Sequence, residues 1–363
     1  MSRAGFLSSL TAVAVGLLAG FFIMLAANPQ QSLSGFAAIL TGGFSGPRNA
    51  GQVLYYAAPV IMTGLSVGLA GKAGLFNIGA PGQFITGAFC AVYVGVKCSF
   101  LPGGLHCAAA LAAAAAAGAL WGCIPGFLKA YRNVNEVIAC IMMNYIGMYL
   151  VNFLIINTVR DALKNQSMRV AEHANLPKLG FDSVFRDGNN ISSANSGILI
   201  AVLMAVVIYV VLEKTSFGYE LKACGFNRDS AKYAGINENR SIIYSMTIAG
   251  AMAGLGGALL YLAGSGNGID VKDVLAPEGF NGIPVALLGL NNPIGIIFSG
   301  LFIAYLTVGG SAIRLFDFAP EVIDIIIAII IYFSAFALLL KGFIQSRGAA
   351  KTKKIKITEK NKT

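Results

Sequence analysis

The stretch GFLSSLTAVAVGLLAGFFIMLA (residues 5–26) contains no charged side chain and has the length of a helix that crosses a membrane. A spanning helix needs about 20 apolar residues. The rest of the 363-residue chain has the same character, with 56% hydrophobic and only 12% charged residues. Soluble domains usually carry about 25% charged residues. The chain is therefore predicted to be an all-α, polytopic membrane protein.

Hydrophobic runs separated by polar segments predict ten transmembrane helices, arranged as two pseudo-repeated halves with broken helices. They are expected near residues 5–26, 52–71, 83–97, 105–122, 137–156, 197–212, 242–263, 277–290, 294–310 and 321–340. Dividing residues 276–340 into two long spans instead of three would put the chain termini on opposite sides of the membrane. With ten spans, the transmembrane domain covers 1–341 and a basic tail covers 342–363.

The positive charges predict the orientation of these spans. Lys and Arg concentrate in the tail and in those short loops that the ten-span topology places on one side, and such residues favour the cytoplasm. We therefore expect a bacterial inner-membrane protein with both termini in the cytoplasm, an external loop at 157–196 and a cytoplasmic loop at 213–240. The net charge of +10 then reflects orientation and contact of the tail with membrane lipid, and nucleic acid is not expected as a partner.

Patterns typical of catalysis or metal binding are missing. The sequence has no GxxxxGK phosphate loop, no zinc-ligand spacing and only two histidines. Glu136, Glu321 and Asp324 lie at or near span ends, where a carboxylate complements a helix N-terminus, and an ion-coupling role is the alternative. The chain is thus expected to be no enzyme and to hold no metal or cofactor. Cys98 and Cys107 bracket a short polar segment, so a disulfide and two free thiols both stay open.

The segment GFNRDSAKYAGIN (225–237) predicts a short helix inside the 213–240 loop. Asn227 or Asp229 can cap the start of this helix, and Gly235 can end it. A glycine-bounded, charged helix suits docking into a cleft of a soluble partner, whereas a solvated connector is the alternative. The residues assigned to this contact with a partner are Gly225, Asn227, Arg228, Asp229, Lys232, Tyr233 and Gly235.

Two broken segments, GLFNIG (74–79) and GFNGIP (279–284), indicate a substrate pathway. Interrupted helices at matching places in two halves are typical of transporter pathways. Side-chain amides could bind a base or a sugar, and phenylalanine faces could stack on a planar ring. Alternatively, the same side chains satisfy backbone groups at the breaks and fill gaps between helices. The pathway candidates are Phe76, Asn77, Gln83, Asn144, Tyr145, Phe280 and Asn281, and Asn135 is expected to cap the 137–156 helix.

Four ordered motifs carry a resemblance to a known family. They are GLSVGLAGKAGLFNIGAPGQFITGAF (64–89), NVNEVIACIMMNYI (133–146), GFNRDSAKYAGINENRSIIYSMTIAGAMAGLGGALL (225–260) and GFNGIPVALLGLNNPIG (279–295). This part of the chain resembles the permease subunits of ABC importers in the branched-chain amino acid and sugar permease superfamily, and most of all its nucleoside branch. One position departs from the branch, because Pro81 stands where a Glu is usual.

The resemblance implies a function and a set of partners. A second permease subunit of a different kind, a cytoplasmic ABC ATPase that binds ATP and Mg, and an external substrate-binding lipoprotein would complete the importer. The coupling helix would then be residues 225–236, and this chain would supply half of the channel without catalysis. The expected substrates are nucleosides; sugars or other small polar solutes are the alternative, and an ion-coupled secondary transporter is the rival class of protein.

Overall fold

The computed structural model describes residues 3–316, 318–319, 322, 324–329 and 332–333. Most of them are helical. The elements before residue 160 are α1 (Arg3–Ala27), α2 (Ser32–Gly42), α3 (Pro47–Lys72), α4 (Ala80–Lys97), α5 (Gly103–Arg132) and α6 (Glu136–Thr158). The predicted basic tail, Glu321 and most of the predicted last span lie outside the described residues.

A polar loop with little regular structure follows α6, and helices then resume. The elements of this part are η1 (Glu172–Ala174), α7 (Phe181–Val184), β1 (Arg186–Asp187), β2 (Asn190–Ile191), α8 (Gly197–Lys214), α9 (Ser216–Phe226), α10 (Arg228–Tyr233), α11 (Glu238–Tyr261), α12 (Pro277–Phe280), α13 (Gly282–Leu288), α14 (Pro293–Ser311) and η2 (Ala312–Leu315). The strands β1 and β2 form a small antiparallel hairpin in which Arg186 pairs with Ile191.

Seven helices of the described residues are long and apolar enough to cross a membrane: α1 from Ser9, α3, α5, α6, α8, α11 and α14. The prediction of a polytopic membrane protein is confirmed at this level. The helix expected near 83–97 is present as α4, but α4 also carries Pro81, Gln83 and Lys97 and is not among the seven. The ten-span count and the repeated halves stay predictions.

The break predicted at GFNGIP (279–284) is confirmed, because α12 ends at Phe280 and α13 begins only at Gly282, and the span expected at 277–290 is therefore not one continuous helix. Pro284 lacks the N–H that a continuous helix would donate to the carbonyl of Phe280, so the helix is interrupted at this point. The other predicted break is confirmed. α3 ends at Lys72, α4 begins at Ala80, and residues 73–79 between them are not helical.

The chain divides into two compact units, and residues 1–36 with 313–363 form the first. Within this unit α1 supplies most of the described structure. The ring of Phe21 meets Phe36 edge to face, with ring centroids 5.2 Å apart. Gly20 of α1 lies directly against the side chain of Ile326. Close contact at a small residue is typical of helices that pack inside a membrane.

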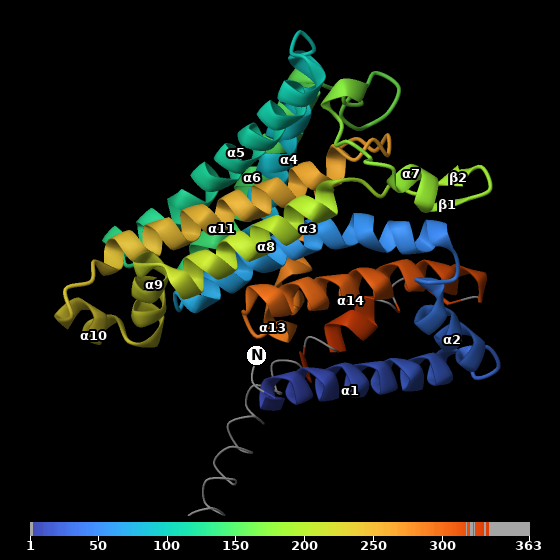
Figure 1. Cartoon of the computed structure of the whole chain (residues 1–363), viewed down its shortest axis with the longest axis horizontal. Helices are drawn as coiled ribbons and strands as arrows, with labels where there is room; N and C mark the ends of the chain where they lie inside the picture. Colours follow the sequence, from blue (N-terminus) through green and yellow to red (C-terminus); the bar gives the residue numbers. More distant parts are fainter. Residues whose placement is uncertain (1–2, 317, 320–321, 323, 330–331, 334–363) are drawn as a thin grey trace, which may run out of the picture. The chain divides into compact units, whose positions relative to one another are not determined.

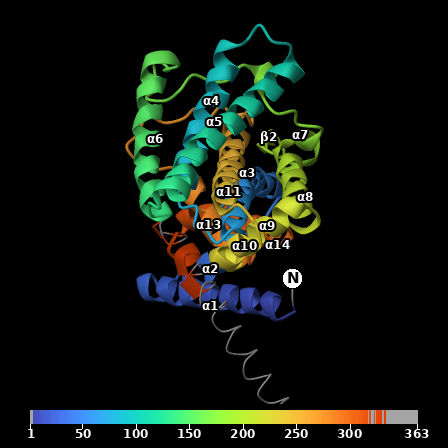
Figure 2. The same cartoon turned by 90° about the vertical axis from the view of Figure 1, so that its left-hand side faces the viewer.

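Residues 37–312 form the second unit, in which α11 is the central helix. It packs against α3, α4 and α5, and α6 lies against α4 (Figure 2). The contact between α5 and α11 is made by glycines. A Cβ atom on Gly118 would lie only 2.9 Å from the Cα of Gly254, and one on Gly250 would lie 3.0 Å from the Cα of Gly122. The backbones of these two helices therefore touch.

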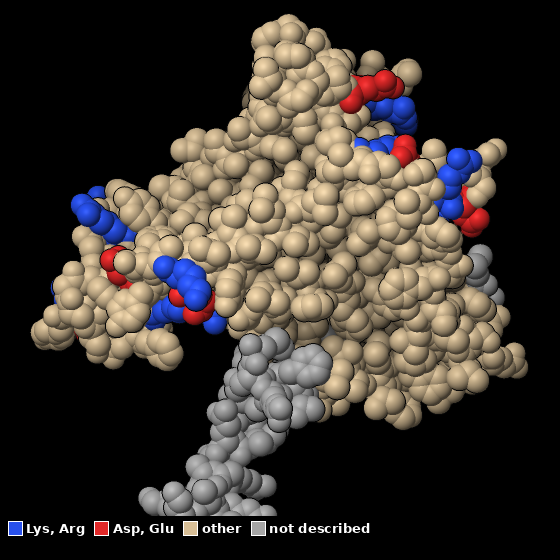
Figure 3. Space-filling model, viewed as in Figure 1, with Lys and Arg blue, Asp and Glu red and all other residues tan. Residues whose placement is uncertain are grey.

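The long helices of the second unit separate two polar ends. The short helix α10 lies at one end of α8 and α11, and the loop with α7, β1 and β2 lies at the other (Figure 1). On the face drawn in Figure 3 the charged side chains gather near these two ends. Large apolar side chains such as Leu199, Leu203 and Val206 of α8 are exposed between them. An uncharged apolar surface of this kind suits contact with lipid chains.

Candidate functional site

The break between α3 and α4 holds a buried cluster of amide side chains. Asn77 is fully buried, and its Nδ2 donates to Ser66 Oγ at 2.9 Å and to Gln83 Oε1 at 2.8 Å. Gln83 Nε2 donates in return to Asn77 Oδ1 at 3.1 Å, and the backbone N–H of Gly79 donates to the same oxygen at 3.2 Å. The polar atoms of both amides thus have partners within the protein.

Asn144 of α6 joins the same region from a different part of the sequence. Its Oδ1 accepts the N–H of Gly82 at 2.9 Å, and its Nδ2 donates to the carbonyl of Ile78 at 3.0 Å. These are backbone groups at the helix break, where the regular helical partners are missing. Three predicted pathway residues, Asn77, Gln83 and Asn144, are therefore brought together, and each binds protein groups.

The two broken segments also meet each other. A Cβ atom on Gly279 of α12 would lie 2.8 Å from the backbone N of Pro81, so α12 packs directly on the start of α4. Pro81 occupies the first turn of α4, where its missing N–H has no intrahelical partner to lose. Thr63 of α3 strengthens this junction by donating to the carbonyl of Glu278 at 3.2 Å.

The other predicted pathway residues lie outside the amide cluster. The side chains of Phe76, Tyr145 and Phe280 are exposed by 38%, 49% and 36%. Asn281 lies between α12 and α13, and its backbone N–H donates to the carbonyl of Pro277 at 2.9 Å. Asn135 caps α6, as predicted, by accepting the N–H of Val137 at 2.9 Å.

The loop predicted to carry a coupling helix contains α9 and α10. Asn227 is the N-cap of α10, because its Oδ1 accepts the N–H of Ser230 at 3.0 Å. Gly235 follows the helix with φ of +82° and allows the chain to turn. Asp229, Lys232 and Tyr233 are exposed, and Arg228 is half-buried. The predicted short, capped helix is confirmed, with Asn227 rather than Asp229 as its cap.

The last turn of α9 contacts the turn that follows α3. A Cβ atom on Gly225 would lie 2.9 Å from the backbone N of Gly74 and would overlap the carbonyl oxygen of Lys72. Gly74 itself has φ of +70°, a conformation that glycine adopts without strain. The backbone of the loop that contains α10 is therefore in direct contact with the segment that precedes Asn77.

A polar cavity of about 440 Å³ lies near the opposite end of α11. Its lining includes Tyr55 and Tyr56 of α3, Tyr261 of α11, Glu278 of α12 and Lys272 of the preceding loop. This cavity was not predicted from the sequence. The available signal was a lone carboxylate directly before the GFNGIP break.

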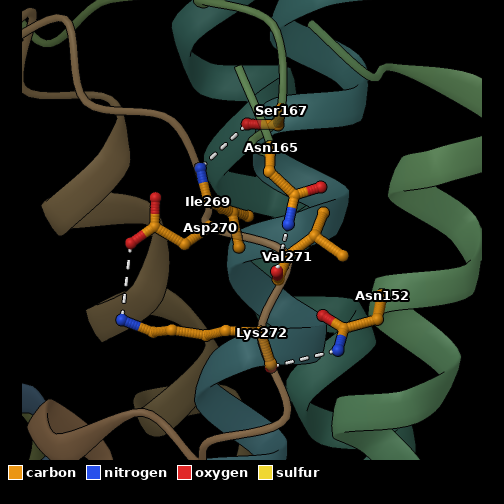
Figure 4. Close-up of polar contacts among 7 residues, drawn as sticks. All are labelled: Asn152, Asn165, Ser167, Ile269, Asp270, Val271 and Lys272. Atoms are coloured by element: carbon orange, nitrogen blue, oxygen red, sulfur yellow. Dashed lines mark hydrogen bonds and ion pairs between the residues drawn. The ribbon is translucent and has the colours of Figure 1, made fainter.

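Two loops that are far apart in the sequence form one wall of this cavity (Figure 4). Ser167 and Ile269 are joined by two hydrogen bonds of 2.9 Å, from Ser167 N to Ile269 O and from Ile269 N to Ser167 Oγ. Asn165 Nδ2 donates to the carbonyl of Val271 at 2.7 Å, and Asn152 Nδ2 of α6 donates to the carbonyl of Lys272 at 3.1 Å. The wall is thus held by hydrogen bonds from both backbone and side-chain groups.

The cysteines and acids build no further site. All six cysteines lie in the structure as free thiols, including Cys98 and Cys107. A disulfide between these two in an oxidising compartment stays a prediction. Across the described part of the chain, no group of three or more His, Cys, Asp or Glu side chains is placed to hold a metal ion. Among these residues, then, the protein chemistry is that of hydrogen bonding and packing.

Comparison with known proteins gives a consistent family. Residues 49–335 match the model of the branched-chain amino acid transport system permease component. The chain is 38% identical to the guanosine ABC transporter permease protein of Bacillus subtilis, over 94% of this chain and 97% of that protein. It is 33% identical to the nucleoside ABC transporter permease protein of Lactococcus lactis, over 97% and 95% of the two chains.

A third relative has a different substrate in its name. The glucose ABC transporter permease protein of Haloferax volcanii is 36% identical over 78% of this chain and 74% of its own length. No solved structure matches the chain. The family match covers the helix break at 73–79, α10 and the cavity alike. The chain belongs to the family of branched-chain amino acid transport system permease components, as a non-catalytic membrane subunit of an ABC importer.

Proposed function

We propose that this permease subunit imports nucleosides. The observation that carries the proposal is the identity of 38% to a guanosine permease protein over nearly the full length of both chains. A nucleoside permease protein supports the same substrate class over 97% of the chain. Sugars are the second candidate, because a glucose permease protein is 36% identical over a smaller share of the chain.

The helix α10 is proposed as the segment that docks into the partner ATPase. It lies beyond the ends of the long helices and is capped by Asn227, so its backbone is ordered without support from a partner. Asp229, Lys232 and Tyr233 are exposed on it and are available for contact with a soluble protein. ATP bound by that partner, with Mg, would supply the energy, and this subunit would move in response.

The sidedness follows from the position of α10. If α10 meets an ATPase, its end of the molecule is cytoplasmic, and the loop at 157–196 is external. This loop would then receive substrate from a binding lipoprotein. The basic residues of the 342–363 tail and the start of the chain would lie on the cytoplasmic side of a bacterial inner membrane, where anionic lipid attracts Lys and Arg. A second, different permease subunit would complete the channel.

The substrate path is proposed to run past the junction of the two broken segments. α12 and the start of α4 touch at Gly279 and Pro81, and half-exposed rings of Phe76 and Phe280 belong to these segments. In this arrangement Asn77, Gln83 and Asn144 hold the break in shape, and Tyr145 and Asn281 are further candidates for contact with substrate. Interrupted helices are the places where polar backbone can face a solute inside a membrane.

Transport by the reconstituted complex tests the proposal. Proteoliposomes should contain this chain, its partner permease and the ATPase, with the binding lipoprotein outside. Uptake of labelled guanosine that requires ATP and is competed by other nucleosides, but not by glucose, is the expected result. Uptake by this chain alone under an ion gradient would support a secondary transporter and contradict the proposal. Competition by glucose alone would favour the sugar alternative.

A further inference from the structure

The cavity near the end of α11 has the size and the walls of a small-molecule site. Its volume of about 440 Å³ falls in the range of about 300–1,000 Å³ that is usual for ligand sites. Residues from α3, α6, α11 and α12 line it together with the paired loops of Figure 4. Because the hydrogen bonds between these loops fix one wall, the cavity exists before any ligand enters.

Glu278 gives the cavity a carboxylate, which can accept hydrogen bonds from a ligand. Ion pairs among the described residues join Lys129 to Glu136, Lys222 to Glu213, and Lys272 to Asp270, so Glu278 has none there. An ionised carboxylate accepts several hydrogen bonds and donates none. A half-buried carboxylate without an ion pair is costly in a folded protein. A ligand that brings hydroxyl or N–H donors would remove part of this cost.

Aromatic rings supply the second feature of the lining. Tyr55 is held in place, since its hydroxyl donates to the carbonyl of Leu260 at 3.1 Å, and it belongs to a buried apolar cluster. The ring of Tyr56 lies 4.9 Å from that of Tyr55, with 56° between the ring planes, and is only partly buried. Tyr56 lines the cavity beside Tyr55, and an aromatic ring can stack on any nucleobase.

We propose that this cavity is a nucleoside-binding site within the permease itself, with the base against the Tyr56 ring and the ribose hydroxyls on the Glu278 carboxylate. The inference rests on the proposed nucleoside function and adds a site and two residues to it. A free base carries the ring, and ribose carries the hydroxyls. Only a nucleoside uses both features, so it should bind more tightly than either part.

Equilibrium binding to the assembled complex tests the site. The permease pair with its ATPase, in lipid nanodiscs and without the binding lipoprotein, is titrated with labelled guanosine, guanine and ribose. We expect Glu278→Gln to weaken guanosine binding by about 10- to 100-fold, because it removes a charged acceptor. Tyr56→Ala should weaken it by about tenfold through loss of stacking. Glu172→Gln, an exposed acid outside the cavity, should change nothing.

The outcomes distinguish a failure of the cavity proposal from a failure of the proposed function. If wild-type complex takes up guanosine with ATP while both cavity variants bind guanosine normally, the cavity proposal is overturned and the proposed function stands. Ribose binding as tight as guanosine binding, or no saturable binding to the wild-type complex, also overturns the site. If wild-type complex transports no nucleoside, the proposed function itself fails. Tyr56→Phe, which keeps the ring, should retain binding and shows whether substitution at this position permits assembly.

Discussion

Replacing Gly225 by alanine should separate ATP hydrolysis from transport. In an exposed helix the change would be favourable by about 1 kcal/mol, because alanine is the better helix former. Here the new methyl group would lie 2.9 Å from the backbone N of Gly74 and 3.0 Å from the carbonyl carbon of Ala73, and would overlap the carbonyl oxygen of Lys72. These are backbone atoms, which cannot rotate away as a side chain can.

The cost of this overlap exceeds the gain in helix propensity. Overpacking at a tight contact typically costs about 1–3 kcal/mol, and the contact with backbone atoms places this site in the upper part of that range. A net penalty of about 1–2 kcal/mol therefore falls on the contact between α9 and residues 73–74. The penalty is relieved if α9 moves away from α3. A loss of 1–2 kcal/mol changes the population of a two-state contact by roughly 5- to 30-fold. Motion of α10 would then reach the helix break less often.

Uptake of guanosine per ATP hydrolysed, measured in proteoliposomes, is the suitable assay. We expect this ratio to fall at least several-fold in Gly225→Ala, while the complex still assembles and hydrolyses ATP, and to fall further in Gly225→Val. Gly104→Ala is the matched control, because no atom lies within 4 Å of a Cβ at that position. A wild-type ratio in both Gly225 variants would refute the idea that this contact transmits motion.

Four further variants test the coupling helix and the predicted pathway residues. Arg228→Glu should lower transport and co-purification of the ATPase while leaving membrane insertion intact; undiminished co-purification would exclude a docking role. Asn227→Ala removes the cap of α10 and should cost about 0.5–2 kcal/mol of local helix stability, seen as faster hydrogen exchange at Ser230; unchanged exchange would contradict the cap. Asn77→Ala together with Asn281→Ala should impair uptake. Asn77→Ala alone should lower the melting temperature of the complex, because it leaves Gln83 without its partner. Normal uptake in the double variant and a normal melting temperature in the single variant would refute these roles.

The sequence predicted the helix break at 73–79 and the polar residues gathered there. Glycines and a proline between two apolar runs cannot continue a helix, so the break is a local property of the chain. Whether the Asn77 amide faces a solute or another side chain depends on packing. Its partners are Ser66, Gln83 and Gly79, and Asn144 arrives from α6 to bind the backbone beside it. Spacing along the chain does not contain that information.

The cavity escaped prediction for a related reason. In the sequence, three of the lining residues lie in long apolar helices with no sign of a site: Tyr55, Tyr56 and Tyr261. Glu278 is a single polar residue before a break. Their common surface arises only because residues 165–167 pair with 269–271, an association across about a hundred residues of chain. The interruption between α12 and α13, in contrast, was predicted from the GFNGIP segment, and Pro284 accounts for it because proline cannot continue the hydrogen bonding of a helix.

The glycine contact between α5 and α11 determines which parts of this subunit can move. An interface made of side chains can re-pack through rotamer changes, but at Gly118, Gly250 and Gly254 the two backbones touch and have no such freedom. α5 and α11 should therefore move as one rigid body throughout a transport cycle. Bending is left to the two interruptions, at 73–79 and at Pro284, which has no N–H to donate to the carbonyl of Phe280. Alternating access would then be a rotation of the interrupted helices at these hinges, relative to the rigid pair formed by α5 and α11.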